Sequence, residues 1–277
     1  KRFYSILASI IKPRKMKKIY FGAAVLFIGL SSCSTSDDAN NGSTSNFLPL
    51  TETSEWVYDV SLDSENIGRD SLYVNGETTI NGAVYKKMNT KSTPTGFYTS
   101  ILNNNSVRKS TDQLLLSGNS GLGLIDFLPI SIELSDFVIF KENAANNQEL
   151  SLVSGTIEQD VQNIPLKIEY KLRSFFKETL SSFTVPGKES YSNVKVIQVK
   201  ANLTVSTVYL LPIINTPITV TLLPAQDVVI STNYYAEGVG MIYSKTNIDY
   251  QLNDVPQGGI NLPIPQQGSS TIEEFLD

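Results

Sequence analysis

Short apolar runs alternate with polar positions along most of the chain, and a period of two is typical of strands with one buried face. The alternation is longest at 195–211, which predicts a strand long enough to bend from one part of a sheet to another. Strands are predicted at 56–62, 71–74, 77–80, 83–88, 97–102, 113–116, 137–140, 150–157, 166–172, 195–211, 218–223, 228–235 and 240–252. The pattern therefore predicts an all-β, mainly antiparallel fold, a curved half-barrel or sandwich with at most one or two short helices.

Turn and helix signals are fewer. The pairs Asn75-Gly76 and Asn81-Gly82 each separate two strand-like runs and predict two hairpins. Residues 173–180 fit either a short helix or the continuation of a strand. Ser270 and Glu273 have the spacing of a capping box and predict a short terminal helix.

The first 32 residues have the layout of an export signal. Residues 1–15 are basic and precede Met16, which we expect to be the true start; they are over-extended translation or a longer basic leader. An apolar run at 19–30 is shorter than the ~20 residues that span a bilayer and suits a signal peptide over 16–32.

Leu30-Ser31-Ser32-Cys33 follows that run and resembles the lipobox of bacterial lipoproteins, whose cysteine is lipidated and becomes the new N-terminus. Cys33 is also the only cysteine, so no intrachain disulfide can form. One acyl chain anchors a protein only marginally, and the resemblance implies a diacylglycerol anchor with further acylation. An ordinary secretory signal or an uncleaved anchor is the alternative.

The mature chain divides by composition into three parts. Residues 33–46 are small and polar and predict a flexible tether, 47–255 a single β-rich domain, and 256–277 a Pro/Gly/Gln connector with a short terminal element. The acidic pair Asp37-Asp38 resembles the export signal of surface lipoproteins in the Bacteroidota. We therefore expect an outer-membrane protein, lipid-anchored at the periplasmic face or the cell surface.

Cleavage before Cys33 changes the charge of the chain. The leader holds 7 of the 22 basic residues and none of the 27 acidic ones, so the mature chain carries 15 basic and 27 acidic groups, a net charge of −12. Nucleic acids and anionic membrane surfaces favour basic patches. We expect no nucleic-acid partner, and membrane attachment through the lipid on Cys33.

The chain has no histidine. Ser-His-Asp and Cys-His catalysis are therefore excluded, together with the commonest metal ligand, and we expect no metal, no cofactor and no catalytic residue. Paired carboxylates, as in glycoside hydrolases, are the remaining catalytic option. Scattered acids could supply such a pair, although solvated surface carboxylates explain them more simply: Asp126, Glu133, Asp136, Glu158 and Asp160.

Two glycines interrupt the strand-like pattern in the last part of the sequence. Gly238 and Gly240 lack the third glycine and the helix of a dinucleotide-binding loop. They predict a structural bend or bulge, where the backbone curves or another chain comes close. Separately, Asp70-Ser71-Leu72 resembles the Asp-Ser/Thr-apolar acceptor of O-glycans in Bacteroidota, which would put a sugar on Ser71.

Tyr-Tyr-Ala-Glu-Gly-Val-Gly-Met-Ile at 234–242, with Trp-Val-Tyr at 56–58 and the hairpin at 80–85, resembles uncharacterised envelope lipoproteins of the TapB type. These resemble the curved half-barrels of the LolA and LppX lipid carriers, which implies a cavity for an acyl chain and no catalytic residues. Apolar runs could line it, or form an ordinary core: 114–116, 122–130 and 210–214.

Three functions remain open at this point. The first is a non-catalytic envelope lipoprotein that binds a lipid or another hydrophobic molecule. The second is a surface glycan-binding or adhesion module, which needs exposed aromatic platforms from Trp56 or the thirteen tyrosines. The third is a carboxylate-based hydrolase.

Overall fold

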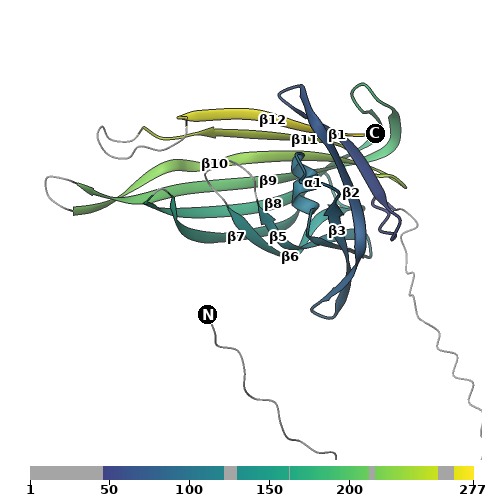
Figure 1. Ribbon diagram of the computed structural model, residues 1–277, viewed down its shortest axis with the longest axis horizontal. Coiled ribbons are helices and arrows are strands. Elements are labelled where there is room, and N and C mark those ends of the chain that lie inside the picture. The colour runs from purple at the N-terminus through teal and green to yellow at the C-terminus, as the bar shows by residue number, and fades with distance from the viewer. Residues whose placement is uncertain (1–45, 122–129, 162, 212–215, 255–264) are drawn as a thin grey trace, which may run out of the picture. The chain divides into compact units, whose positions relative to one another are not determined.

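A computed structural model describes residues 46–121, 130–161, 163–211, 216–254 and 265–277 (Figure 1). These residues form twelve strands and one short helix, in the order β1 (Glu55–Leu62), β2 (Glu65–Ile80), β3 (Ala83–Thr90), α1 (Phe97–Leu102), β4 (Ser106–Ser110), β5 (Gln113–Gly121), β6 (Ser131–Lys141), β7 (Gln148–Val161), β8 (Ile164–Thr184), β9 (Ser190–Leu211), β10 (Thr216–Ala236), β11 (Gly240–Gln251) and β12 (Gln267–Leu276). No helix of these residues is long and apolar enough to cross a membrane.

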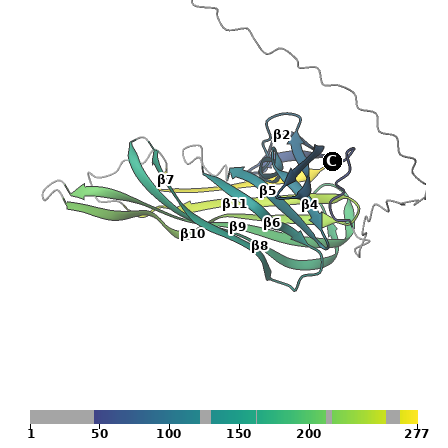
Figure 2. The same cartoon turned by 90° about the horizontal axis from the view of Figure 1, so that it is seen from below.

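The strands form one twelve-stranded sheet in the order β6-β5-β4-β3-β2-β1-β12-β11-β10-β9-β8-β7. Neighbouring strands of this sheet all pair antiparallel, so the all-β antiparallel prediction is confirmed. The sheet curves until its two edges approach each other (Figure 2). Ser174 on β8 donates a hydrogen bond to the Val138 carbonyl on β6 (2.5 Å), so the barrel-shaped sheet is nearly closed.

Alternation along the strands sorts side chains between the two faces of the sheet. On β1, Trp56, Tyr58 and Val60 point inward and are buried, whereas their neighbours are half-buried or exposed. The main core lies on this inner face and draws side chains from both halves of the sheet and from α1. Because burying a large apolar side chain contributes about 1.5–3 kcal/mol, this core is the main source of stability.

The long strand predicted at 195–211 is confirmed as part of β9, which has 22 residues, and its neighbours β8 and β10 have 21 each. The strand alternative for 173–180 is the correct one, because that stretch lies within β8 and pairs with β9. The runs at 218–223 and 228–235 are a single strand, β10, whose register against β9 shifts three times. Those irregularities explain the interruption in the apolar pattern.

One predicted strand is wrong: residues 97–102 form the helix α1. Phe97, Tyr98 and Leu102 all face the core, and Leu102 lies four residues after Tyr98, one helical turn on. The Glu274 carboxylate, on the distant strand β12, accepts two of the free N–H groups of the first turn. Tertiary contacts, which a local pattern cannot reveal, therefore favour the helix.

The hairpin predicted at Asn75-Gly76 is also wrong. β2 continues through this pair, because β3 pairs with both flanking segments across a register shift between Val74 and Glu77. Gly76 supplies the positive φ (73°) of this bulge. The true turn is Asn81-Gly82, with φ of 50° and 81°, as a type I′ hairpin requires.

The predicted terminal helix is replaced by β12. Ser270 and Glu273 have capping-box spacing, but their segment pairs with β1 on one side and β11 on the other. Two ladders of backbone hydrogen bonds outweigh a cap worth about 1 kcal/mol. The chain's last strand thus joins its first strand to the rest of the sheet.

Candidate functional site

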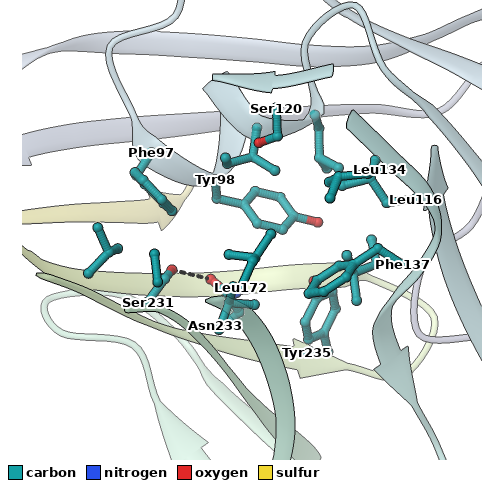
Figure 3. A pocket seen from close by; sticks show the side chains of 16 residues that line it. Phe97, Tyr98, Leu116, Ser120, Leu134, Phe137, Leu172, Ser231, Asn233 and Tyr235 are labelled. Carbon is teal, nitrogen blue, oxygen red and sulfur yellow. Dashed lines mark hydrogen bonds between the residues drawn. The ribbon is translucent and has the colours of Figure 1, made fainter. Parts of the chain in front are cut away.

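A cavity of about 40 Å³ lies inside the sheet beneath α1, and we call it the chamber (Figure 3). Its walls come from α1 and from five strands that face one another across the barrel, β5, β6, β8, β9 and β10. Sixteen side chains line it: Phe97, Tyr98, Ile101, Leu102, Leu116, Ser120, Leu134, Phe137, Ile139, Leu172, Val199, Ala201, Val229, Ser231, Asn233 and Tyr235. None of them is charged, and most are hydrocarbon.

Two buried carboxylates hold the N-terminal end of α1. Asp70 on β2 accepts hydrogen bonds from the backbone N–H groups of Thr95 (3.0 Å) and Gly96 (2.7 Å). Glu274 on β12 accepts from the backbone N–H groups of Tyr98 (2.7 Å) and Thr99 (3.0 Å). The Thr99 hydroxyl lies 2.5 Å from Asp70 Oδ2 and 3.0 Å from Glu274 Oε1, and so joins the two acids. We call this group the α1 latch.

Close packing makes the α1 latch intolerant of change. A methyl group at Gly96 would overlap the Glu274 carboxylate, so only glycine fits there. Asp70 and Glu274 are 1% and 0% exposed. Burial raises the pKa of Glu274 to about 7; its hydrogen bonds to Thr99 and Tyr98 oppose the shift, and the charge of Asp70 adds to it. No cation takes part in the hydrogen bonds of either carboxylate.

Three polar groups inside the chamber lack a well-formed hydrogen bond. The hydroxyls of Tyr98, Tyr235 and Ser120 are buried, and those of the two tyrosines interact with each other only at poor geometry. Burial also raises the pKa of both tyrosines well above the usual 10, so their hydroxyls stay protonated. Such groups cost about 1–3 kcal/mol each when nothing satisfies them. A cavity that keeps three such hydroxyls among apolar side chains is suited to binding a molecule.

The amide of Asn233 adds a fourth polar group. Its Oδ1 accepts hydrogen bonds from the hydroxyls of Ser244 (2.8 Å) and Ser231 (3.3 Å), and Thr246 in turn donates to Ser231 (2.9 Å). These bonds engage the oxygen of the amide, and no hydrogen bond from its NH₂ group is found among the described residues. Figure 3 shows Asn233 and Ser231 on the wall opposite Tyr98.

The predicted site residues are scattered relative to the chamber. Cys33, with its leader and tether, lies outside the described residues, so its lipidation stays a prediction. Ser71 is half-buried in the middle of β2, where it pairs with Val57. Its glycosylation also stays a prediction, and the neighbouring Asp70 belongs to the α1 latch.

Gly238 lies in the tight turn between β10 and β11, and Gly240 is the first residue of β11; their φ angles are 76° and 117°. A side chain at Gly240 would meet the indole of Trp56, whose Nε1 donates a hydrogen bond to the Val239 carbonyl (2.7 Å). The turn is therefore a place where the first strand of the sheet approaches the backbone closely.

The acids named as possible catalytic pairs do not meet in the chamber. Glu158 and Asp160 line an open groove of about 550 Å³ at the end of β7, and both are exposed. Asp136 is paired with Arg108, which lowers the pKa of the carboxyl. Glu133 is exposed on β6, and Asp126 lies outside the described residues. Two of these acids thus share a groove, and the hydrolase hypothesis stays a prediction.

Aromatic platforms for a glycan are equally lacking among the described residues. Trp56 is 5% exposed, and each described tyrosine is buried or half-buried. Of the apolar runs considered for a cavity, 114–116 lies in the core and Leu116 lines the chamber. Most of the other two runs lies outside the described residues.

The α1 latch and the unpaired hydroxyls were missed by sequence reasoning. A signal was present: Asp70 shares its phase in β2 with the buried Leu72 and Val74, and Glu274 shares its phase with Ile272 in β12. An acid at an inward position of a strand indicates either a buried partner or a functional group. Tyr98 gave no such signal, because the apolar pattern of its segment predicts a strand and the segment forms a helix.

Comparisons with known proteins identify no family for this chain. No family model matches the chain, and no curated protein matches it. One solved structure that matches is described as "a putative lipoprotein from Parabacteroides distasonis"; it is 15% identical, with a TM-score of 0.37, over 85% of this chain and all of that one. Likeness at this level says nothing about a ligand or an activity.

Proposed function

We propose that the protein is an outer-membrane lipoprotein anchored through Cys33, and that its β domain is a non-catalytic binder of a hydrophobic molecule. The anchor follows from the order of basic leader, apolar run, small residues and cysteine. The binding function rests on one observation, the uncharged chamber enclosed between the sheet and α1. Ligand sites are typically concave and apolar with a few placed polar groups.

The size of the chamber defines the state that the structure represents. A volume of about 40 Å³ accommodates only about three water molecules, whereas sites for larger ligands span about 300–1,000 Å³. We regard this as the closed state. Four of the lining side chains come from α1, so a shift of this six-residue helix would enlarge the chamber without disturbing the sheet.

Lipid extraction from the protein tests the proposal. The lipidated chain, purified from membranes in detergent, is extracted, and the non-covalently bound lipids are identified by mass spectrometry. We expect a stoichiometric apolar molecule in the wild type. Ala201→Leu, which fills the chamber, should lose it, whereas the same change at the exposed Ala225 should not.

Folding must be checked in parallel, because an overpacked core costs about 1–3 kcal/mol. The milder Ala201→Val serves as a second variant, and each variant is compared by thermal unfolding. Retention of the same molecule by folded Ala201→Leu protein, or no bound molecule in the wild type, would rule out the chamber as the site.

A further inference from the structure

We infer that the chamber selects an uncharged ligand whose polar end accepts hydrogen bonds, such as the ester or amide of a hydrocarbon chain, over the corresponding carboxylate. The inference rests on the proposed function and specifies its ligand. It follows from the kinds of polar group that face the chamber and from the charges behind its walls.

Every unpaired polar group of the chamber can donate. Tyr98, Tyr235 and Ser120 have hydroxyls without a well-formed hydrogen bond, the two tyrosines interacting only with poor geometry, and Asn233 lines the chamber with an amide whose oxygen is already engaged. Figure 3 shows Tyr98 reaching into the chamber from α1 and Tyr235 rising from β10. A carbonyl or ether oxygen placed among these groups would satisfy several donors at once.

The charges around the chamber disfavour an anion. No lysine or arginine lines it, so a bound carboxylate would have no cation to compensate its desolvation. Behind α1 lie two acids, Asp70 and Glu274, and the pKa of Tyr98 is raised mainly by burial, with a smaller contribution from the charge of Glu274. An anionic head group would therefore meet both an uncharged wall and a repulsive field.

Binding of a matched pair of ligands tests this selectivity. The full lipidated chain in detergent micelles is titrated with methyl laurate or with laurate at pH 8.5, where laurate is ionised, and complexes are counted by native mass spectrometry. We expect methyl laurate to bind at least about tenfold more tightly. Comparing each variant with the wild type for the same ligand cancels the partitioning of that ligand into micelles.

The variants remove donors from the chamber. Tyr98→Phe combined with Tyr235→Phe should weaken binding of the ester about tenfold or more, because two neutral hydrogen bonds are lost. Binding of laurate should change little. The control is Tyr234→Phe, which removes a hydroxyl from the adjacent residue on the other face of β10 and should leave both affinities unchanged.

Each result separates this inference from the proposed function. If laurate binds as tightly as its ester, the selectivity is wrong, while a ligand-binding chamber stands. If the double variant binds the ester like the wild type, the hydroxyls are not donors to the ligand and the inference fails. If neither ligand binds and membrane-purified protein carries no lipid, the proposed function fails as well.

Discussion

Adjacent residues on β10 and β12 point to opposite faces of the sheet and into different surroundings. Tyr235 and Glu274 point inward, toward α1 and the chamber, whereas Tyr234 and Glu273 point outward. On the outer face the rings of Tyr234 and Phe183 lie nearly flat on one another, 4.2 Å apart at 19°. On the inner face the rings of Tyr98 and Tyr235 meet edge to face, 6.3 Å apart at 71°.

The two faces differ in the hydrogen bonding of their tyrosine hydroxyls and glutamate carboxylates. On the outer face the Tyr243 hydroxyl donates to the half-buried Glu273 carboxylate, which also lies 3.9 Å from Lys245 Nζ. On the inner face, a fully buried acid without a cation lies behind α1, and the hydroxyls of Tyr98 and Tyr235 lack a well-formed hydrogen bond. The outer face therefore resembles ordinary packing, whereas the inner face retains arrangements that cost stability and that function can explain.

The largest contrast is expected from truncation. Tyr235→Ala should lower the free energy of unfolding by about 3–5 kcal/mol, because it removes a fully buried ring from the core. Tyr234→Ala should cost only about 1–2 kcal/mol, since its ring is half-buried. Urea unfolding measures both, and equal losses would contradict the distinction between the two faces.

A pH series distinguishes the two glutamates. Because the pKa of Glu274 is raised to about 7 in the folded state, its contribution to stability is present at low pH and is lost as the pH rises through 7. Unfolding free energy should fall by about 2–3 kcal/mol between pH 5 and 8.5 through this group.

Glu274→Gln should flatten that slope even if the amide fits the α1 latch poorly and lowers overall stability. Glu273→Gln, one residue away and outward-facing, should keep it. A slope that survives in Glu274→Gln would assign the pH dependence to other groups. Unfolding curves at four or five pH values are sufficient.

The smallest effect concerns single hydroxyls. Tyr235→Phe should raise the free energy of unfolding of the ligand-free protein by about 1 kcal/mol, because it removes an unpaired buried group. Tyr234→Phe should stay within about 0.5 kcal/mol of the wild type. A loss of stability in Tyr235→Phe would mean that its interaction with the Tyr98 hydroxyl is a stabilising hydrogen bond.

The sequence predicted the fold class and the long strand because alternation is a local property that burial on one face imposes. It failed at 97–102 and at Ser270 to Glu273, where pairing and capping across distant parts of the chain decide the structure. The chamber could not be predicted, since its walls come from six elements between α1 and β10. Asp70 could have been noticed as an acid at an inward position.

The position of β12 determines when the domain can complete its folding. β1 pairs with β2 along one edge. Its other edge pairs with β12, more than 200 residues later in the chain, as in the pairing of Tyr58 with Leu276. Such distant pairings slow folding. Glu274 belongs to the same strand, so α1 cannot be held in position until β12 has paired with β1 and β11. The chamber beneath α1 is therefore one of the last parts of the domain to be completed.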